Sequence, residues 1–359
     1  MSRRIRIFYE VFGDDQNVNA QSLNARGIAL RLDPENFESS FLVTGRPDPK
    51  LVGKPHIRFI RLPSHLKGIF AKMYLLCSSE DILVYPRYSF HRPLFSIVLR
   101  RSLRRKKLVC PVEAPLTHLQ KENPNANKRI RRILRKSDFI VPISDYISRD
   151  LQENLRIEAH TIIPGGIDTR FFYPIKRSAS STVCVLFVGR LIDRKGLETI
   201  VEAAVLFPEV HFRIVGSAYG KMDGAFARRM RQRVNEDNLK NVAFVGTLSQ
   251  EQLRQLMWDS DILLHPSRIE GIPRVTQEAG ATGMPSIIFD DYRTPSVVDG
   301  VTGFQVKTFE EMIDRLRLLI DNGDLRSQMG AAAVELVKQF DCGVVAKRWE
   351  EVFKQLTPN

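Results

Sequence analysis

The strongest candidates for chemistry in the sequence are two carboxylates eight residues apart, Glu270 and Glu278. They lie in the segment 270–283, which reads Glu-Gly-Ile-Pro-Arg-Val-Thr-Gln-Glu-Ala-Gly-Ala-Thr-Gly. A short apolar run, residues 261–266, precedes this segment and is typical of a buried strand. Carboxylate oxygens are good acceptors for paired sugar hydroxyls. One acid at a strand's end and one inside the next helix could therefore hold a ligand at two points.

A helix is expected to begin at Pro273, because a proline loses no hydrogen bond at the first helical position. The N–H groups of Arg274, Val275 and Thr276 would then have no partner within the helix. With the positive end of the helix dipole, they would form a place for an anion or a sugar hydroxyl. The alternative is a solvated helix that carries two ordinary acids.

Two cations lie in a second loop between a strand and a helix. Val188-Gly189-Arg190-Leu191 ends an apolar strand, and Lys195-Gly196 opens the helix that follows. Gly189 permits a tight exit from the strand. Arg190, as a planar fork, and Lys195, as a point charge, could both reach one diphosphate. Surface charge beside a turn glycine is the alternative.

These two motifs resemble those of the retaining GT-B glycosyltransferases, in particular family 4, the glycosyl transferases group 1. The hallmarks of that family are a Glu, seven residues and a second Glu at a strand-to-helix junction, and a strand followed by Gly-Arg-Leu and then Lys-Gly. The resemblance implies that Glu278 holds the ribose of a sugar nucleotide and that Glu270 contacts the donor sugar. It also implies that the cations Arg190 and Lys195 hold the donor diphosphate.

The resemblance assigns further donor contacts to backbone groups. In the family, amides just after the first Glu hold sugar hydroxyls or the diphosphate. The corresponding residues here are Gly271, Ile272, Pro273, Arg274 and Val275. Two strand-ending turns of the family line the nucleotide base, and they correspond to the turns at Gly216 and Gly246, where a glycine lets a flat base approach the backbone. Ordinary strand-ending glycines are the alternative, and the turns do not distinguish uracil, guanine and adenine.

The first half of the chain matches the family only loosely. Gly13 opens the loop 13–17 after the first strand, where the family usually has a richer glycine loop close to the donor phosphate and the acceptor. Asp14 and Asp15 disfavour a phosphate cradle in this loop. These acids could instead hydrogen-bond an acceptor sugar.

Glu113 is a second departure from the family pattern. It follows the expected strand 108–112, after which the family often places a His near the acceptor hydroxyl. A Glu can orient an acceptor or accept a proton if its pKa suits, and the alternative is a loop residue in a salt bridge. His118, five residues later, is a further candidate, with a hydrogen-bonded structural imidazole as its alternative.

Short apolar strands alternate with helical segments along the whole chain, which predicts α/β domains with parallel, doubly wound sheets. The strands are expected at 4–11, 41–44, 57–61, 82–85, 108–112, 139–142 and 161–163, then at 183–189, 212–215, 242–245, 262–265 and 286–289. The helices are expected at 20–32, 65–77, 92–105, 125–135 and 145–154, then at 196–207, 224–236, 250–259, 273–282, 309–321 and 324–340.

The break at 164–168, rich in Pro and Gly, divides the chain into two expected Rossmann-like domains, 1–167 and 168–343. In such sheets ligands bind outside the carboxyl ends of the strands. The resemblance implies the GT-B arrangement, in which the two domains face a central cleft. It also implies that a final helix, 344–357, can return to the acceptor-binding first domain, while the second domain binds the nucleotide sugar.

Composition indicates a globular protein without a resident cofactor. At 359 residues and 43% apolar content, the chain is long enough for two cores, and its apolar runs are shorter than the roughly 20 residues of a membrane span. The start of the chain lacks the apolar core of a signal peptide. Four scattered cysteines without a Cys-x-x-Cys pair predict reduced, buried thiols and a cytoplasmic location. We expect neither an Asp-x-Asp dyad nor a His/Cys cluster with ligand spacing, and the cations Arg190 and Lys195 make a bound metal unnecessary, so the nucleotide sugar is the expected co-substrate without a metal.

The net charge of +13 belongs entirely to the first half, where residues 1–167 hold 29 Lys and Arg against 16 Asp and Glu. Such a one-sided charge predicts an anionic partner. The basic runs at 100–107 and 128–136 could contact an anionic membrane or a lipid-linked acceptor, which would make the protein peripheral at the inner face of the membrane. A buried crossover helix with cations in its last turn is the alternative for the first run. Nucleic acid is disfavoured, because aromatic residues are sparse in these runs.

The function that the resemblance implies is transfer of a sugar from a UDP- or GDP-linked donor to an acceptor hydroxyl with retained anomeric configuration. The developing charge lies on the leaving diphosphate, where Arg190, Lys195 and the helix amides could stabilise it. Together with Glu270 and Glu113, the two cations are the predicted catalytic residues. The competing hypotheses are a non-catalytic sugar- or lipid-binding scaffold and a sugar-nucleotide epimerase on the same fold.

Overall fold

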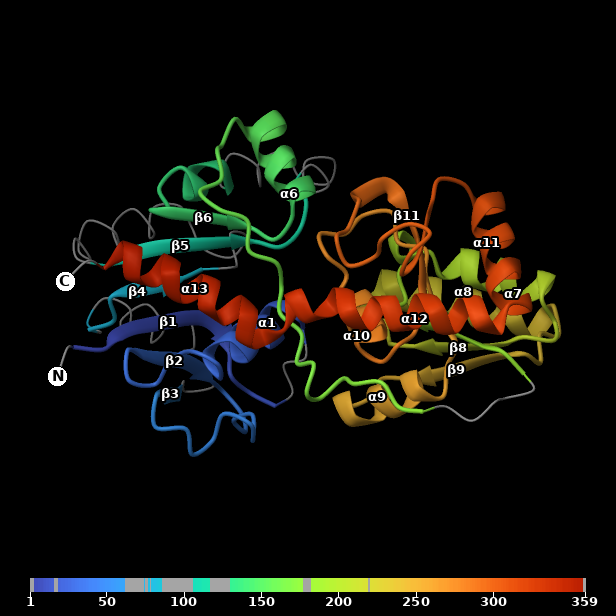
Figure 1. Ribbon diagram of the computed structural model, residues 1–359, viewed down its shortest axis with the longest axis horizontal. Helices are drawn as coiled ribbons and strands as arrows, with labels where there is room; N and C mark the ends of the chain where they lie inside the picture. The colour runs from blue at the N-terminus through green and yellow to red at the C-terminus, as the bar shows by residue number, and fades with distance from the viewer. Residues whose placement is uncertain are drawn as a thin grey trace. The chain divides into compact units, whose positions relative to one another are not determined.

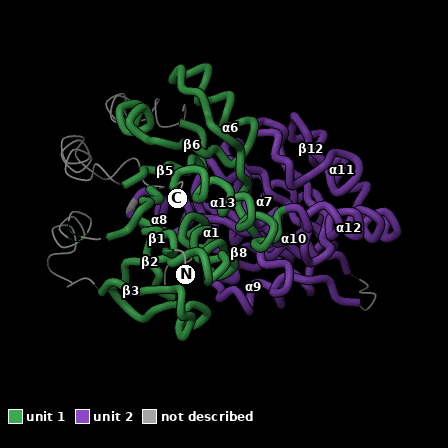
Figure 2. The backbone as a smooth tube through the Cα atoms, turned by 60° about the vertical axis from the view of Figure 1, so that its left-hand side comes forward, with its two compact units in different colours: residues 1–166, 340–359 green, residues 167–339 purple. Residues whose placement is uncertain are grey.

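The computed structural model describes residues 3–15, 19–61, 79–85, 106–116, 130–176, 182–218 and 220–357, together with Tyr74 and Cys77. The chain divides into two compact units (Figures 1 and 2). Unit 1 comprises residues 1–166 and 340–359, and unit 2 comprises residues 167–339. The first boundary lies one residue from the expected one, and the chain returns to unit 1 at Phe340, slightly before the expected final helix.

Unit 1 is built on a six-stranded parallel sheet with the order β3-β2-β1-β4-β5-β6. Its strands are β1 (Ile5–Phe12), β2 (Phe37–Val43), β3 (Ile57–Arg61), β4 (Ile82–Val84), β5 (Lys107–Val112) and β6 (Phe139–Pro142). The expected strand 161–163 is wrong, since this stretch only donates single hydrogen bonds toward β6, such as Ile163 N–H to Pro142 O at 3.1 Å. The proline that follows it has no N–H with which to continue a ladder.

The described helices of unit 1 are α1 (Ala20–Ala29), α6 (Asp145–Asp150) with a π-helical turn at Leu151–Leu155, and α13 (Cys342–Leu356). Asp341 caps α13 by accepting the N–H of Gly343 at 2.7 Å. Val345, Trp349 and Phe353 form an apolar stripe on α13 that is buried in the core of unit 1. The last helix therefore packs beside α1 and completes this core (Figure 1). The expected helices 65–77 and 92–105 and part of 125–135 lie outside the described residues.

Unit 2 repeats the same design, with the strand order β12-β11-β10-β7-β8-β9, all parallel. Its strands are β7 (Cys184–Val188), β8 (His211–Val215), β9 (Val242–Gly246), β10 (Ile262–His265), β11 (Ser286–Phe289) and β12 (Gly303–Val306). The strand β12 was not expected from the sequence. It opens with Thr302-Gly303, a pair that favours a turn, and it has only four residues.

The helices of unit 2 are α7 (Leu197–Leu206), α8 (Gly220–Glu236), α9 (Gln250–Trp258), α10 (Arg274–Ala281), α11 (Phe309–Asp321) and α12 (Gly323–Val337). Three of these helices, α9, α11 and α12, begin at a residue whose side chain caps the helix. Ser249 and Gln252 form a reciprocal capping box at α9, and Thr308 caps α11 through the N–H of Glu311 at 3.2 Å. Because β7 and β10 are paired neighbours and parallel, the loops after them emerge at the same edge of the sheet.

Candidate functional site

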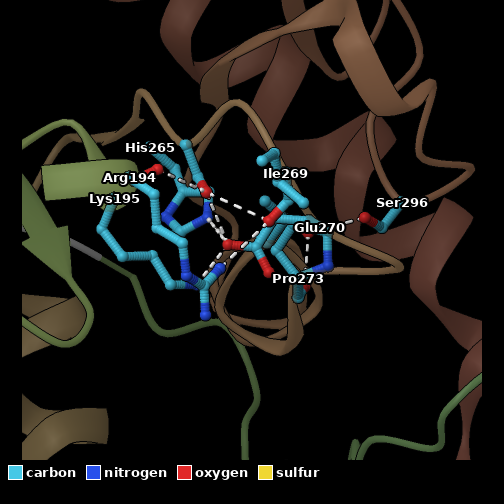
Figure 3. A network of polar contacts seen from close by, with 9 residues as sticks. Arg194, Lys195, His265, Ile269, Glu270, Pro273 and Ser296 are labelled. Atoms are coloured by element: carbon cyan, nitrogen blue, oxygen red, sulfur yellow. Dashed lines mark hydrogen bonds and ion pairs between the residues drawn. The ribbon is translucent and has the colours of Figure 1, made fainter. Parts of the chain in front are cut away.

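The loops after β7 and β10 are joined at a close backbone contact in unit 2. Gly196 has φ +73°, and a Cβ at this residue would lie 2.3 Å from the carbonyl oxygen of Pro266. Only glycine tolerates both that conformation and that approach. The Ser267 hydroxyl oxygen lies 3.3 Å from the Arg194 carbonyl oxygen, and the Arg194 guanidinium donates to the Ile269 carbonyl at 3.4 Å (Figure 3). The two loops therefore act as one surface.

This junction brings together two of the predicted residues, Lys195 and Glu270. The Lys195 ammonium contacts Oε1 of Glu270, and both side chains are largely buried, with 15% and 14% exposed. The Ser267 hydroxyl donates to the same Oε1 at 2.7 Å, and His265 Nε2 lies 3.4 Å from it (Figure 3). The cation expected to hold a diphosphate thus lies beside the acid expected to contact a sugar.

Burial and charge act in opposite directions on this cluster. Burial alone would raise the pKa of Glu270, but the Lys195 ammonium and the contact with His265 hold that pKa well below its ordinary value. Burial lowers the pKa of His265, and the charge of Lys195 lowers it further, although Glu270 acts in the opposite sense. At neutral pH the cluster is therefore an ion pair beside a neutral imidazole.

Glu278 lies on the second turn of α10 and pairs with Arg274, one turn before it. Arg274 Nε donates to Glu278 Oε1 at 2.9 Å, and only 5% of the Glu278 side chain is exposed. Burial raises the pKa of Glu278, and the Arg274 guanidinium offsets this only in part. The expectation for Arg274 concerned its backbone amide as a donor contact. In the structure its guanidinium also forms an ion pair with the buried carboxylate of Glu278.

The start of α10 differs from the expectation in two respects. Pro273 is the N-cap, with ψ 118°, so the first helical residue is Arg274. The N–H of Thr276 is not without a partner, because it donates to the Pro273 carbonyl at 3.1 Å. The fixed φ of proline suits the extended cap as well as the first helical turn.

A chain of buried hydroxyls fixes this helix start. Thr276 Oγ1 donates to the Pro273 carbonyl at 2.7 Å and lies 2.6 Å from Ser296 Oγ (Figure 3). Ser296 Oγ in turn lies 2.9 Å from Thr294 Oγ1. If Thr276 donates to the carbonyl, Ser296 must donate to Thr276 and Thr294 to Ser296. The loop after β11 therefore sets the direction in which α10 leaves the site.

Three of the predicted glycines of unit 2, Gly189, Gly216 and Gly246, meet at the ends of β7, β8 and β9. Gly216 has φ +133°, and a Cβ there would lie 1.8 Å from the carbonyl oxygen of Gly189. Its N–H donates to the carbonyl of Gly246 at 2.8 Å. Arg190 follows Gly189 and is exposed, and its guanidinium makes no ion pair with another residue in the described ranges.

We expect Gly216→Ala to destabilise the protein by about 3 kcal/mol or more, because the methyl group collides with backbone that carries two strand ends. Gly246→Ala is the matched control, since Gly246 also has a positive φ, +87°, but has open space around it. That control should lose only about 1 kcal/mol from backbone strain. Urea unfolding followed by circular dichroism measures both, and equal losses would show that the collision has no effect.

The segment that holds this site is similar to known glycosyltransferases. Residues 168–336 match the model of the family Glycosyl transferases group 1. This match spans nearly all of unit 2, which therefore resembles a group 1 glycosyltransferase domain. An uncharacterized glycosyltransferase of Methanocaldococcus jannaschii is 23% identical over 307 residues, which cover 84% of each chain. A GDP-mannose-dependent monoacylated alpha-(1-6)-phosphatidylinositol monomannoside mannosyltransferase of Corynebacterium glutamicum is 27% identical over 58% of this chain and 60% of its own length.

Solved structures show the same fold over nearly the whole chain. Sucrose-phosphate synthase from Thermosynechococcus elongatus has a TM-score of 0.83 at 22% identity and covers 99% of both chains. Anabaena HepE, in complex with UDP and glucose, has a TM-score of 0.80 at 17% identity and covers 98% of this chain and all of its own. The predictions of a GT-B fold and of a glycosyltransferase are confirmed.

The first loop of unit 1 has a structural task within that unit. Asp14 is 3% exposed, and its carboxylate accepts the N–H groups of Thr44 and Gly45 at 3.1 and 3.0 Å. The hypothesis that Asp14 binds an acceptor sugar is therefore wrong, because its oxygens hold the loop after β2. The backbone of Gly13 is engaged there too, since its N–H donates to the Leu42 carbonyl at 2.9 Å.

Glu113 lies at a small cavity within unit 1. Its Oε1 accepts a hydrogen bond from Asn24 Nδ2 at 3.2 Å, and its side chain is partly buried. The cavity measures about 30 Å³, which is room for about one water molecule. Its walls are mostly apolar and come from Ala25, Ile28, Val84, Ile143, Ile163 and Trp349, among others. His118 and most of the basic run 100–107 lie outside the described residues.

No group of three or more His, Cys, Asp or Glu side chains in the described ranges could hold a metal ion. The expectation that the chain has no Asp-x-Asp dyad is wrong, since Asp259 and Asp261 form one. Asp261 accepts the N–H of Cys184 at 2.8 Å and so ties the start of β7 to that of β10. No helix in the described part of the chain combines the length and the apolar character of a membrane span.

Two residues of the cluster, His265 and Ser267, were not singled out from the sequence. His265 ends the apolar run of β10, and Ser267 follows two residues later, just before Glu270. A polar residue at the carboxyl end of a buried parallel strand is a signal for a site, because ligands bind at that edge. The sequence contained this signal, but His265 and Ser267 are equally typical of an ordinary turn at the end of a strand.

Proposed function

We propose that this chain is a retaining glycosyltransferase of family 4 that moves a sugar from a nucleotide sugar to an acceptor hydroxyl. The observation that carries this proposal is the contact of Lys195 with Glu270 across two loops at one sheet edge. A cation for the diphosphate and an acid for the sugar hydroxyls lie where a donor of this kind needs both. Arg190, exposed at the end of β7, is the second cation that can meet the diphosphate.

The chemistry we assign to these residues is electrostatic. As the bond from the sugar to the diphosphate breaks, negative charge develops on the leaving group, and fixed cations stabilise it without reorganisation. Lys195 and Arg190 supply that charge, and the positive end of the α10 dipole adds to it. Transfer is therefore expected to continue in the presence of a chelator such as EDTA.

The donor base is proposed to be uracil or guanine. Support comes from the relative named as GDP-mannose-dependent and from the structural neighbour that holds UDP. The acceptor is proposed to be a glycan or a lipid-linked sugar that approaches unit 1, where Glu113 borders the cavity. The basic excess of the first half supports an anionic membrane surface as the place of action, at the cytoplasmic face.

The test is a thermal-shift screen against UDP-glucose, GDP-mannose and ADP-glucose, each beside its free nucleoside diphosphate. A ligand that binds only the folded state stabilises it by about 2.7 kcal/mol at 100 times its Kd. One nucleotide pair should raise the melting temperature above the others. If none does, the donor site is wrong and a non-catalytic scaffold becomes the better hypothesis.

Product analysis with the selected donor then separates the enzymatic alternatives. A transferase forms a new glycoside only when acceptor sugars or lipid-linked sugars are added, and proton NMR of the anomeric position reports whether the configuration is retained. An epimerase instead converts the nucleotide sugar without any acceptor. Inversion at the anomeric carbon would reject family 4 chemistry while leaving the transferase assignment intact.

A further inference from the structure

The two carboxylate oxygens of Glu270 have different surroundings. All the polar contacts described for this side chain are made by Oε1, with Lys195, Ser267 and His265 around it (Figure 3). Oε2 makes no hydrogen bond or ion pair with another residue of the described ranges. The carboxylate is thus held by one oxygen and presents the other to a ligand.

His265 is a buried imidazole whose two ring nitrogens lack well-formed hydrogen bonds. It is 1% exposed, and neither ring nitrogen makes a hydrogen bond with good geometry. Nε2 nevertheless faces Glu270 Oε1 at 3.4 Å, slightly beyond ordinary hydrogen-bond length. The ring of Phe187 lies nearly parallel to the imidazole, with 6.5 Å between ring centres, and limits its rotation. A buried N–H without a partner costs free energy, so a small approach of the two groups is favourable.

Binding of the nucleotide-sugar donor would favour a closer contact between His265 and Glu270. The Lys195 ammonium is the cation in contact with Glu270, and the same ammonium is the group assigned to the diphosphate. A diphosphate beside Lys195 competes with Glu270 for its three N–H donors. Glu270 then needs other donors at Oε1 if Oε2 is to keep its direction.

We propose that His265 is a positioning residue that takes the place of Lys195 at Glu270 Oε1 when a diphosphate draws the ammonium away. This inference rests on the proposed function. Ser267 holds the same oxygen from the loop, at 2.7 Å, and His265 holds it from the end of β10. The two supports leave Oε2 directed at a hydroxyl of the donor sugar. The competing interpretation is that His265 only fills space in the core.

The experiment compares His265→Gln, which keeps an N–H donor close to the position of Nε2, with His265→Leu, which removes the donor at similar volume. We expect His265→Leu to lower kcat about 10-fold or more, as for the loss of a hydrogen bond to a charged group, and His265→Gln to stay within about threefold of wild type. Calorimetry should show that the affinity for the free nucleoside diphosphate falls in the leucine variant and is kept in the glutamine variant, because the diphosphate alone draws Lys195 from Glu270. The affinity for the sugar nucleotide should fall in the leucine variant alone.

Equal losses in the two variants, or a nucleoside diphosphate affinity that is unchanged in the leucine variant, would assign His265 a packing role and overturn the proposal. If either His265 variant fails to fold, Ser267→Ala carries the test. It removes the other support of Oε1 and should lower kcat and the affinities for both the sugar nucleotide and the free nucleoside diphosphate, and wild-type values would overturn the proposal. Failure of the proposed function is distinguishable, because the wild-type protein would then neither bind nor transfer a sugar nucleotide.

Discussion

Lys195→Met is expected to lower kcat/KM for sugar transfer by about 10²- to 10³-fold. Removal of one preorganised group that stabilises developing charge has an effect of this size in other enzymes. The methionine keeps most of the side-chain volume and loses only the ammonium that contacts Glu270. Steady-state kinetics with the donor selected by thermal shift measure the effect.

The same substitution should also reduce stability, for a separate reason. It leaves the Glu270 carboxylate, 14% exposed, without the cation that contacts it, and loss of one partner of a buried pair costs about 3–5 kcal/mol. Because the folded-state pKa of Glu270 is depressed, its contribution to stability is present above the ordinary value of 4.5 and is lost as the pH falls through the folded pKa. The stability gap between wild type and Lys195→Met should therefore be largest near neutral pH and shrink in acid.

The double variant Lys195→Met/Glu270→Gln separates the two effects. It has no uncompensated carboxylate, so its melting temperature should recover most of the loss while transfer stays low. Lys338→Met is the matched control, since Lys338 is 62% exposed and pairs with Glu335 on the surface. A double variant that recovers transfer together with stability would show that Lys195 acts only on the fold.

Most strands of both sheets follow from local sequence pattern, with β12 as an exception, and the site follows from where those strands end. The strand β10 was predictable because Ile262, Leu263 and Leu264 form a short apolar run, and α10 because Pro273 precedes a helical pattern. Parallel strands place their carboxyl ends at one edge. That geometry is enough to predict that the loops with Lys195 and Glu270 are neighbours.

Contacts between loops could not be predicted in the same way. The approach of Gly196 to Pro266, which places Lys195 on Glu270, depends on the backbone of two segments 70 residues apart in sequence. The role of Asp14 also depends on a distant loop, since its partners are Thr44 and Gly45. A sequence shows that a carboxylate is present, but it does not show whether backbone amides or a ligand will bind its oxygens. Tertiary packing decides which donors reach a buried carboxylate.

Glu278→Gln is expected to lower transfer by about 100-fold while the fold is preserved or strengthened. If the carboxylate holds two ribose hydroxyls, glutamine replaces one of its acceptors by a donor and loses the charge that strengthens both bonds, each worth about 1.5–3 kcal/mol. Sugar-nucleotide affinity measured by calorimetry should fall together with kcat/KM. Glu335→Gln, an exposed acid on α12, is the control and should change neither.

The stability expected of the Glu278→Gln variant distinguishes a ligand-binding role of Glu278 from a structural role. Because burial raises the pKa of Glu278 despite Arg274, the folded protein binds this proton more tightly than the unfolded chain. The favourable contribution is therefore complete below the unfolded value and is lost as the pH rises through the folded pKa. Glutamine cannot ionise, so the variant should unfold at a temperature equal to or above that of wild type at pH 8, with no such advantage near pH 4. A buried acid that costs stability at working pH is explained by ligand binding, and a variant that lost stability but kept transfer would reject that explanation.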